Sequence, residues 1–291
     1  SAIFNRLKKD GYKNIIVVSK KKLNLLDQKK VEKFFKKKKP KIVIIAAAKV
    51  GGILANKNFK ANFIYENLTI QSNIIHSSYL SGVKNLIFLG SSCIYPKKTK
   101  QPIKENYFMT GTLEETNDAY AIAKIAGVKM CMEYSKQYKL NYKTLMPANM
   151  FGSNDNYDLK TSHFFPALIK KIHLAKISNK KTVTLWGNGK PKRELLYVED
   201  FADACVFFMR KKTKENLINI GSGVEKSIKE FAKYIMKKLN INLKIKYDLS
   251  KPNGMQRKKL DLTIANKYGW KAKTKLDEAF KKVYLDYLKI K

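Results

Sequence analysis

Short apolar runs alternate with longer amphipathic stretches as far as about residue 150. Runs of five or six residues with the composition of buried strands lie at 14–18, 42–46, 84–89 and 142–146. Helical periodicity covers residues 1–9, 28–39, 62–80 and 118–138. Strands that alternate with helices predict an α/β fold whose sheet is parallel.

The regular alternation of predicted strands and helices changes after residue 152. Helices are predicted at 162–176, from Glu199, at 227–239 and from Asp277, and strands at 183–186, 194–198, 217–220 and 243–245. These elements predict a smaller α/β lobe over the carboxyl edge of the main sheet. Since no low-complexity linker separates the two parts, we expect them to share one cleft.

The first predicted helix has nothing before it in this sequence. A Rossmann-like doubly wound sheet opens with a strand and a Gly-rich turn that leads into its first helix. We therefore expect the chain to start inside its first βα unit, with that strand and turn missing. An incomplete unit of this kind is expected to bind a dinucleotide poorly.

The composition fits a soluble globular protein, with 44% hydrophobic residues. No apolar run reaches the ~18 residues of a membrane span, and the N-terminus lacks a signal-peptide pattern. A cytoplasmic protein without membrane association is the expectation. The three cysteines lie far apart and show no metal-binding spacing, so neither a disulfide framework nor a metal site is predicted.

The formal net charge of +37 allows a second class of protein, a Lys-rich nucleic-acid-binding protein. Only four of the 60 basic residues are Arg, the residue that recognises phosphates and bases in a bidentate manner. The lysines are spread over nearly every helix, which favours a coding bias over a nucleic-acid partner. The nucleic-acid hypothesis predicts a steep loss of binding with salt and no need for Tyr120.

Tyr120 and Lys124 are candidate catalytic residues. They lie one helical turn apart on the same face of their predicted helix. A fixed ammonium beside a phenol favours the phenolate, so we expect Lys124 to lower the pKa of Tyr120. Ser91 follows the strand at 84–89 and would lie at the carboxyl edge of the sheet. Together the three residues are typical of carbonyl–alcohol proton transfer beside a nicotinamide.

Lys20 stands at the end of the predicted strand 14–18. In a Rossmann unit this position meets the adenosine ribose, where an acidic residue selects NAD and a cation suits the 2′-phosphate of NADP. In so Lys-rich a chain, an ordinary surface lysine remains an equal interpretation.

With these residues in view, the sequence resembles the extended short-chain dehydrogenases/reductases and, among them, the GDP-L-fucose synthases. The resemblance extends almost from Ser1 to the C-terminus. Its most specific stretches are LNLLD at 23–27, which includes Leu25, AAAKVGGI at 46–53, GSSCIYP at 90–96 and YAIAKIAG at 120–127.

The resemblance implies an NADPH-dependent enzyme that converts GDP-4-keto-6-deoxy-D-mannose into GDP-L-fucose by 3,5-epimerisation and then 4-keto reduction. Ser91, Tyr120 and Lys124 match the reductase residues, and Cys93 and His163 match the epimerase pair. A 4-keto group acidifies the hydrogens on C3 and C5, so inversion needs a base and an acid. For Cys93 alone, the alternative is a small buried apolar residue. For His163, near the start of a helix, the alternative is a capping or solvated role.

Further positions follow from the resemblance only. It implies an NADP-binding domain at 1–151 plus about 195–217 and a substrate lobe at 152–194 plus 218–291. A homodimer is suggested separately by the long helices predicted at 62–80 and 118–138. The cofactor contacts are Lys20, Leu25, Leu89, Gly90, Ser91, Ser92, Lys124, Pro147, Ala148, Asn149, Met150 and His163. The substrate contacts are Lys171, Trp186, Arg193 and Asn253.

Asn253 departs from the family pattern, which commonly has Asp there, and we expect altered rather than abolished binding. The runner-up function is another nucleotide-sugar enzyme of the same superfamily, a 4-epimerase or a 4,6-dehydratase. Neither needs the pair formed by Cys93 and His163.

Overall fold

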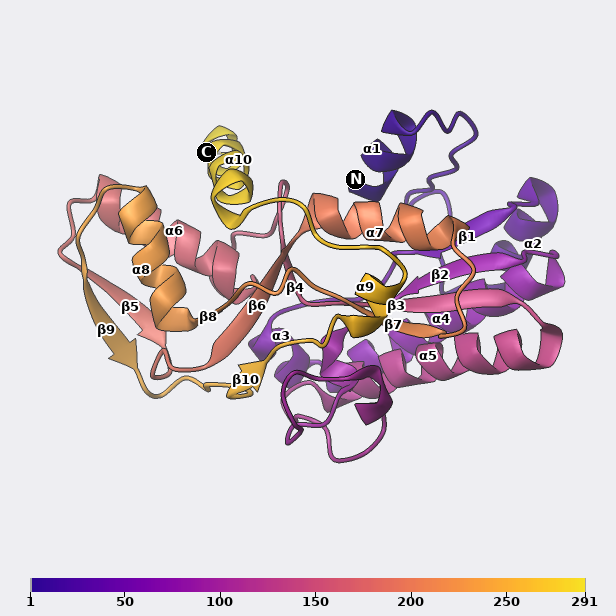
Figure 1. Cartoon of the computed structure of the whole chain (residues 1–291), viewed down its shortest axis with the longest axis horizontal. Coiled ribbons are helices and arrows are strands. Elements are labelled where there is room, and N and C mark those ends of the chain that lie inside the picture. Colours follow the sequence, from indigo (N-terminus) through magenta and orange to yellow (C-terminus); the bar gives the residue numbers. More distant parts are fainter. Residues whose placement is uncertain (1, 291) are drawn as a thin grey trace.

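A parallel four-stranded sheet forms the centre of the larger part of the molecule (Figure 1). The computed structural model describes residues 2–290. The strands are β1 (Ile42–Ile45), β2 (Asn85–Leu89), β3 (Asn141–Pro147) and β7 (Leu217–Ile220), in the order β1-β2-β3-β7. Because all neighbours are parallel, their carboxyl ends meet at one edge, as the alternation of strands and helices predicted.

Helices cover both faces of this sheet. On one face lie α4 (Lys60–Leu80) and α5 (Asp118–Tyr138), while α7 (Val198–Arg210) covers the other and carries α1 (Ala2–Lys9) on its outer side (Figure 1). The helix α2 (Gln28–Lys38) packs beside α4 and begins at Asp27, whose side chain accepts a hydrogen bond from the Lys30 backbone N–H. The predicted helices are confirmed to within a few residues.

The predicted strand at 14–18 is wrong. Its backbone joins no β-ladder, and the side chains of Ile16 and Val17 are 48% and 72% exposed. A strand needs a neighbour for its backbone N–H and C=O groups. Among residues 2–290, β1 pairs only with β2, and no ladder forms between its other edge and residues 14–18.

A second hydrophobic core lies beside the sheet and includes Phe165, Phe231 and Phe280. It is formed by α6 (Phe164–Ile177), β5 (Thr182–Trp186), α8 (Ile228–Lys238), β9 (Lys244–Asp248) and α10 (Leu276–Lys289). The first core, around Phe88 and Leu145, also takes in Trp270, which follows α9 (Thr263–Lys267). The chain therefore returns to the first core after building most of the second.

Short elements that the sequence pattern did not predict connect the two cores. They are α3 (Ile53–Asn58), β4 (Asn149–Phe151), β8 (Glu225–Ser227), β10 (Arg257–Lys258) and α9. β6 (Lys192–Tyr197) pairs with three of these elements, β4, β8 and β10. These strands hold two to three residues each, too few to show a periodic pattern.

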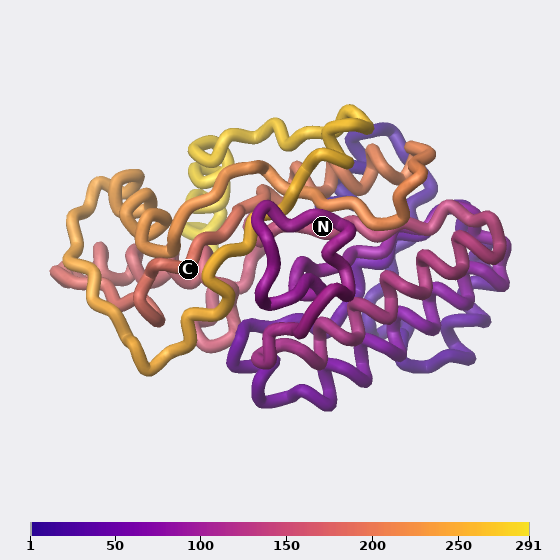
Figure 2. The backbone as a smooth tube through the Cα atoms, turned by 60° about the horizontal axis from the view of Figure 1, so that its bottom comes forward, coloured from indigo at the N-terminus to yellow at the C-terminus, as the bar shows by residue number. Residues whose placement is uncertain are grey.

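The long loop at 92–117 is folded rather than open. It contains two 3₁₀ turns (Ser92–Ile94 and Glu105–Tyr107), and the Glu105 carboxylate accepts a hydrogen bond of 2.8 Å from the Asn219 backbone N–H. Ile103 bridges to Leu260, and Figure 2 shows the two segments side by side. The loop is therefore fixed to β7 and to the segment after β10.

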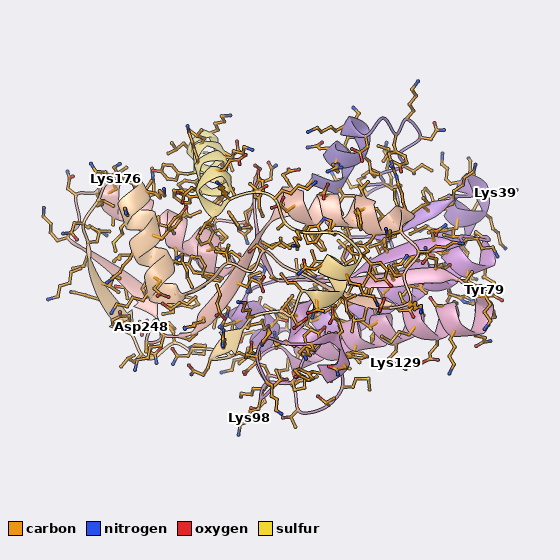
Figure 3. The ribbon with its side chains drawn as sticks, viewed as in Figure 1. Lys39, Tyr79, Lys98, Lys129, Lys176 and Asp248 are labelled. Carbon is orange, nitrogen blue, oxygen red and sulfur yellow. The ribbon has the colours of Figure 1, made fainter. Side chains whose placement is uncertain are left out.

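Basic side chains project from widely separated parts of the molecule. Figure 3 labels Lys39, Lys98, Lys129 and Lys176, which lie at the periphery on both cores. Within residues 2–290, no helix combines the length and the apolar character that crossing a bilayer requires.

Gly127 gives a direct test of how α5 packs. A Cβ at this position would lie 2.5 Å from Cζ of Phe88 and 2.8 Å from Oε1 of Gln71. In a helix interior, alanine is more stable than glycine by about 1 kcal/mol. Overpacking a core, in contrast, destabilises the protein by about 1–3 kcal/mol. We therefore expect Gly127→Ala to lower the free energy of unfolding in urea. Ala126→Gly, on the same helix, should lose only the propensity difference of about 1 kcal/mol. A stabilised Gly127→Ala variant would contradict this packing.

Candidate active site

The end of β2 delivers Ser91 to the carboxyl edge of the sheet. A Cβ at Gly90 would lie 2.1 Å from Sδ of Met146, so only glycine lets β2 run this close to β3. The Gly90 backbone N–H donates to the Leu145 carbonyl oxygen at 2.9 Å, which extends the pairing to the last residue before Ser91. Ser91 then has an extended backbone and begins the first 3₁₀ turn.

Lys124 lies beneath this edge, with 3% of its surface exposed. Its Nζ donates to the Leu89 carbonyl oxygen at 2.9 Å and lies 4.5 Å from the centre of the Phe88 ring. Burial lowers the pKa of Lys124 to about 8. The ammonium is therefore held in place by the end of β2.

The expectation that Lys124 lowers the pKa of Tyr120 is wrong for this structure. Burial raises the pKa of Tyr120 well above its usual value, a negative charge on Cys93 would add to this, and a hydrogen bond from Ser91 opposes it. The Lys124 Nζ lies 5.9 Å from the centre of the Tyr120 ring. At neutral pH Tyr120 is thus a protonated phenol, which is a proton donor.

Cys93 is 5% exposed and lies in the 3₁₀ turn that follows Ser91. Burial raises the pKa of its thiol, while the positive charge of Lys258, a hydrogen bond from Ser91 and the charge of Lys124 lower it. Lys258 is the neighbour of Arg193 in the β6–β10 pairing. Burial lowers the pKa of Lys258, and the field of Cys93 opposes this. The thiol therefore lies within the field of a half-buried cation.

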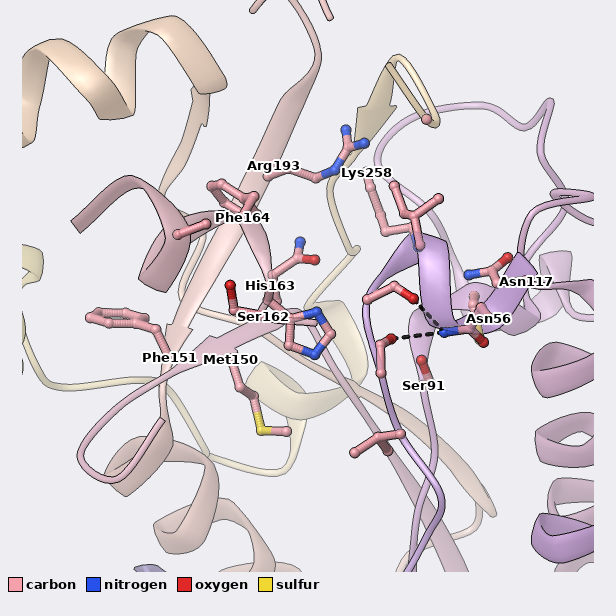
Figure 4. A pocket seen from close by; sticks show the side chains of 18 of the residues that line it. Asn56, Ser91, Asn117, Met150, Phe151, Ser162, His163, Phe164, Arg193 and Lys258 are labelled. Carbon is pink, nitrogen blue, oxygen red and sulfur yellow. Dashed lines mark hydrogen bonds between the residues drawn. The ribbon is translucent and has the colours of Figure 1, made fainter. Parts of the chain in front are cut away.

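His163 stands at the start of α6 rather than within it, in extended backbone conformation. Figure 4 shows its imidazole in the cavity. His163 directly precedes α6, Cys93 lies in the 3₁₀ turn after β2, and both line the same space. The cavity has a volume of about 590 Å³, within the range of small-molecule sites.

Cations and an aromatic ring line the other end of the cavity. The Lys171 Nζ donates to the Thr184 carbonyl oxygen at 3.1 Å and lies 5.3 Å from the centre of the Trp186 ring. The Arg193 Nη1 donates to the Met255 carbonyl oxygen at 2.6 Å, and burial lowers the pKa of Arg193 to about 10. These groups suit a diphosphate and a planar base.

The side chain of Asn253 forms a hydrogen bond within the protein. Its Oδ1 accepts a hydrogen bond of 2.8 Å from the Asn188 backbone N–H, in the turn that follows β5. Gly187 in this turn has φ +65°, and a Cβ there would lie 2.2 Å from the same Oδ1. Asn253 thus fixes the turn next to Trp186 as well as lining the cavity.

The structure brings most of the predicted site residues together. The cavity is lined by Gly90, Ser91, Ser92, Cys93, Tyr120, Pro147, Ala148, Asn149, Met150, His163, Lys171, Trp186, Arg193 and Asn253. Leu89 and Lys124 lie directly beneath it. Lys20 and Leu25 do not line this cavity; Lys20 is exposed in a turn, and the Leu25 carbonyl oxygen accepts a hydrogen bond from Asn73.

Several cavity residues were missed by the sequence analysis, namely Asn56, Glu114, Asn117, Ser162 and Lys258. Lys258 could not be recognised from the sequence, because the chain has 60 basic residues and the position of Lys258 does not distinguish it from a surface lysine. Asn117 is the one with a usable signal, because it immediately precedes the helix that carries Tyr120.

A parallel sheet with Ser, Tyr and Lys at its carboxyl edge, below a cleft shared by two cores, defines a class of nicotinamide-dependent enzymes. A model of the NAD dependent epimerase/dehydratase family matches residues 1–221, and the chain belongs to this family.

Among its relatives, the GDP-L-fucose synthase of Sinorhizobium fredii is 47% identical over 274 residues, which cover 94% of this chain and 87% of that protein. The GDP-L-fucose synthase of Escherichia coli is 42% identical over 297 residues, which cover 99% of this chain and 92% of that protein. The GDP-mannoheptose C4 reductase of Campylobacter jejuni, solved with NADP bound, superposes with a TM-score of 0.89 at 35% identity and covers 99% and 94% of the two chains. The resemblance seen in the motifs is confirmed.

The charge of Lys258 is expected to act on the Cys93 thiol. Lys258→Met removes a cation that lowers the thiol pKa, so the pKa should rise. Alkylation of Cys93 by iodoacetamide at pH 8 should slow roughly 3- to 10-fold, and its pH profile should move to higher pH. The modified residue is identified by mass spectrometry, since Cys131 and Cys205 are also present but fully buried. Lys259→Met is the matched control, and an unchanged profile for Lys258→Met would refute the coupling.

Proposed function

We propose that this protein converts GDP-4-keto-6-deoxy-D-mannose to GDP-L-fucose by epimerisation at C3 and C5 followed by NADPH-dependent reduction at C4. The supporting observation is that two proton-transfer sets line one cavity. Ser91 and Tyr120 lie on one wall, with Lys124 below, while Cys93 and His163 supply a second acid and base. The second set has no purpose in a simple 4-epimerase, which needs no proton exchange at C3 and C5.

The residues present fit a nicotinamide cofactor. Gly90, Ser91 and the backbone of 147–150 line the cavity at the carboxyl edge, where dinucleotides bind in open α/β sheets. When bound, NADPH supplies the hydride for the carbonyl carbon. Lys20 is proposed to contact the 2′-phosphate and Leu25 the adenosine end, outside the cavity described above.

The first stage moves protons at carbon. Loss of a proton from C3 or C5 leaves an enolate whose oxygen Tyr120 and Ser91 stabilise by hydrogen bonds. Because burial keeps the Cys93 thiol protonated at neutral pH, Cys93 acts as the acid and His163 as the base. Proton removal by His163 on one face and proton return from Cys93 on the other inverts one centre. Exchange with solvent then returns a proton to Cys93 and removes one from His163, so that the same pair can invert the second centre.

The second stage places a proton on oxygen. As the carbonyl carbon becomes tetrahedral, Tyr120 donates its phenolic proton to the developing alkoxide. The Lys124 ammonium, held by the Leu89 carbonyl oxygen, then stabilises the phenolate that remains. Lys171 and Arg193 are proposed to bind the diphosphate, Trp186 the guanine, and Asn253 the nucleoside side of the substrate.

Two lobes are part of this proposal. The cofactor lobe is proposed to comprise residues 1–151 and about 195–217, and the substrate lobe 152–194 and 218–291, except that β7 and the segment around Trp270 belong to the first core. The segment around Trp270 returns from the substrate lobe to the first core and would tie the two together. A cytoplasmic location remains a prediction.

Deuterium exchange tests the bifunctional chemistry. The purified protein is incubated with GDP-4-keto-6-deoxy-D-mannose and NADPH in deuterated water, and the product is analysed by NMR. We expect deuterium at C3 and C5 of a fucose product, with both lost in Cys93→Ser while NADPH binding persists. NADPH oxidation without deuterium at either carbon would leave a simple reductase. Absence of oxidation and exchange in a folded protein that binds NADPH would favour the 4-epimerase or 4,6-dehydratase.

A homodimer formed through α4 and α5 extends the proposal. Tyr65 on α4 is 63% exposed, and Tyr138 on α5 stacks on Tyr79 at 4.1 Å while remaining 37% exposed. Such aromatic side chains on adjacent helices are typical of subunit contacts. In sedimentation velocity we expect twice the chain mass of 33.5 kDa. Tyr65→Asp combined with Tyr138→Asp should give the monomer, whereas Ile177→Asp, at an equally exposed site on α6, should not. A wild-type monomer would exclude the dimer.

A further inference from the structure

Residues that line the cavity carry buried polar atoms that form no hydrogen bond within the protein. Within residues 2–290, four buried side-chain atoms have no hydrogen-bond partner, and they are Asn56 Oδ1, Asn117 Oδ1, Thr144 Oγ1 and Ser162 Oγ. All but Thr144 line the cavity. Buried polar groups are nearly always paired, so a group of unpaired atoms around one space indicates that a ligand supplies the partners.

Asn56 is held in a fixed orientation. Its side chain is on α3 and the residue is 7% exposed; Nδ2 donates to the carbonyl oxygens of Gly51 and Gly52 at 2.7 and 3.1 Å. Because both amide hydrogens are used in this way, Oδ1 is the free end of the side chain (Figure 4). The Gly52 backbone N–H donates to the Thr161 carbonyl oxygen at 3.1 Å, which joins this segment to the loop before His163.

Asn117 supplies a second amide on the same side. It precedes α5 directly and so lies within one turn of Tyr120. Figure 4 shows Asn117 next to Asn56, on the side of the cavity that carries Ser91. Two amide oxygens without donors therefore lie on the same side of the cavity, and one of them belongs to a residue within one helical turn of Tyr120.

We propose that Asn56 and Asn117 are specificity residues for the sugar, whose amide oxygens accept hydrogen bonds from its ring hydroxyls. The inference rests on the proposed function for the identity of the sugar. A 4-keto-6-deoxyhexose linked through C1 retains two free ring hydroxyls, on C2 and C3, and both are donors. One amide oxygen for each hydroxyl satisfies both residues and rejects a sugar that lacks either donor.

The test compares two substrates, GDP-4-keto-6-deoxy-D-mannose and its 3-deoxy analogue, by the rate of NADPH oxidation. Asn56→Ala and Asn117→Ala should each lower kcat/KM for the hydroxylated substrate roughly 10- to 100-fold. The 3-deoxy analogue lacks the hydroxyl that one of the two asparagines would bind. For that asparagine, the alanine variant and the wild type should have the same kcat/KM on the analogue, while the other variant should still have a lower value. Asn58→Ala, an exposed asparagine of the same helix, is the control and should change neither value.

Equal losses for both variants on both substrates would assign the asparagines a structural role and overturn the inference. Asn56→Ala also removes the bonds to Gly51 and Gly52 and could fail to fold. Asn117→Ala then carries the test, because within the described residues no hydrogen bond of its side chain is lost.

A binding experiment separates this inference from the proposed function. Should the wild type turn over neither substrate, the proposed function fails, and calorimetry with GDP-mannose and with GDP still tests the subsite. We expect Asn117→Ala to weaken binding of GDP-mannose roughly 10-fold while the affinity for GDP stays unchanged. Unchanged affinity for GDP-mannose in both variants would overturn the subsite.

Discussion

The close approach of α5 to the carboxyl ends of β2 and β3 is the constraint on which the site depends. Gly127 lets the helix touch the Phe88 ring, and Gly90 lets β2 run against Met146. Lys124, one turn from Tyr120, is then near enough to donate to the Leu89 carbonyl oxygen at 2.9 Å. The relative positions of the strand end, the ammonium and the phenol are thus set by core packing, which tolerates changes of one methyl group poorly.

Burial is the largest cause of the pKa shifts of Tyr120, Cys93, Lys124 and Arg193. Burial raises the pKa values of Tyr120 and Cys93 and lowers those of Lys124 and Arg193, to about 8 and about 10. In each case the neutral form is favoured, as desolvation requires. For Tyr120 this result fits the direction of the reaction, because reduction of a carbonyl consumes a proton and a neutral phenol has one to give.

Much of the fold could be read from the sequence, since strands such as 84–89 and helices such as 118–138 carry strong periodic patterns. The run at 14–18 has the pattern of a strand but lacks a neighbour, and no local pattern reports on a neighbour. Lys258 and Asn56 enter the cavity through a two-residue strand and a six-residue helix, which are too short for periodicity to mark. The pKa of Tyr120 depends on how deeply the folded protein buries it, and the spacing of Tyr120 and Lys124 in the sequence does not predict that burial.

Ser91 connects the two kinds of chemistry in the cavity. Its hydroxyl acts on both Tyr120 and Cys93, and in each case it lowers the pKa of the neighbouring group. The field of Cys93 in turn raises the pKa of Tyr120. A thiolate left after Cys93 gives up its proton would therefore hold Tyr120 in its protonated form, the form needed for reduction. In the proposed mechanism, epimerisation and reduction are therefore coupled through the charge on Cys93.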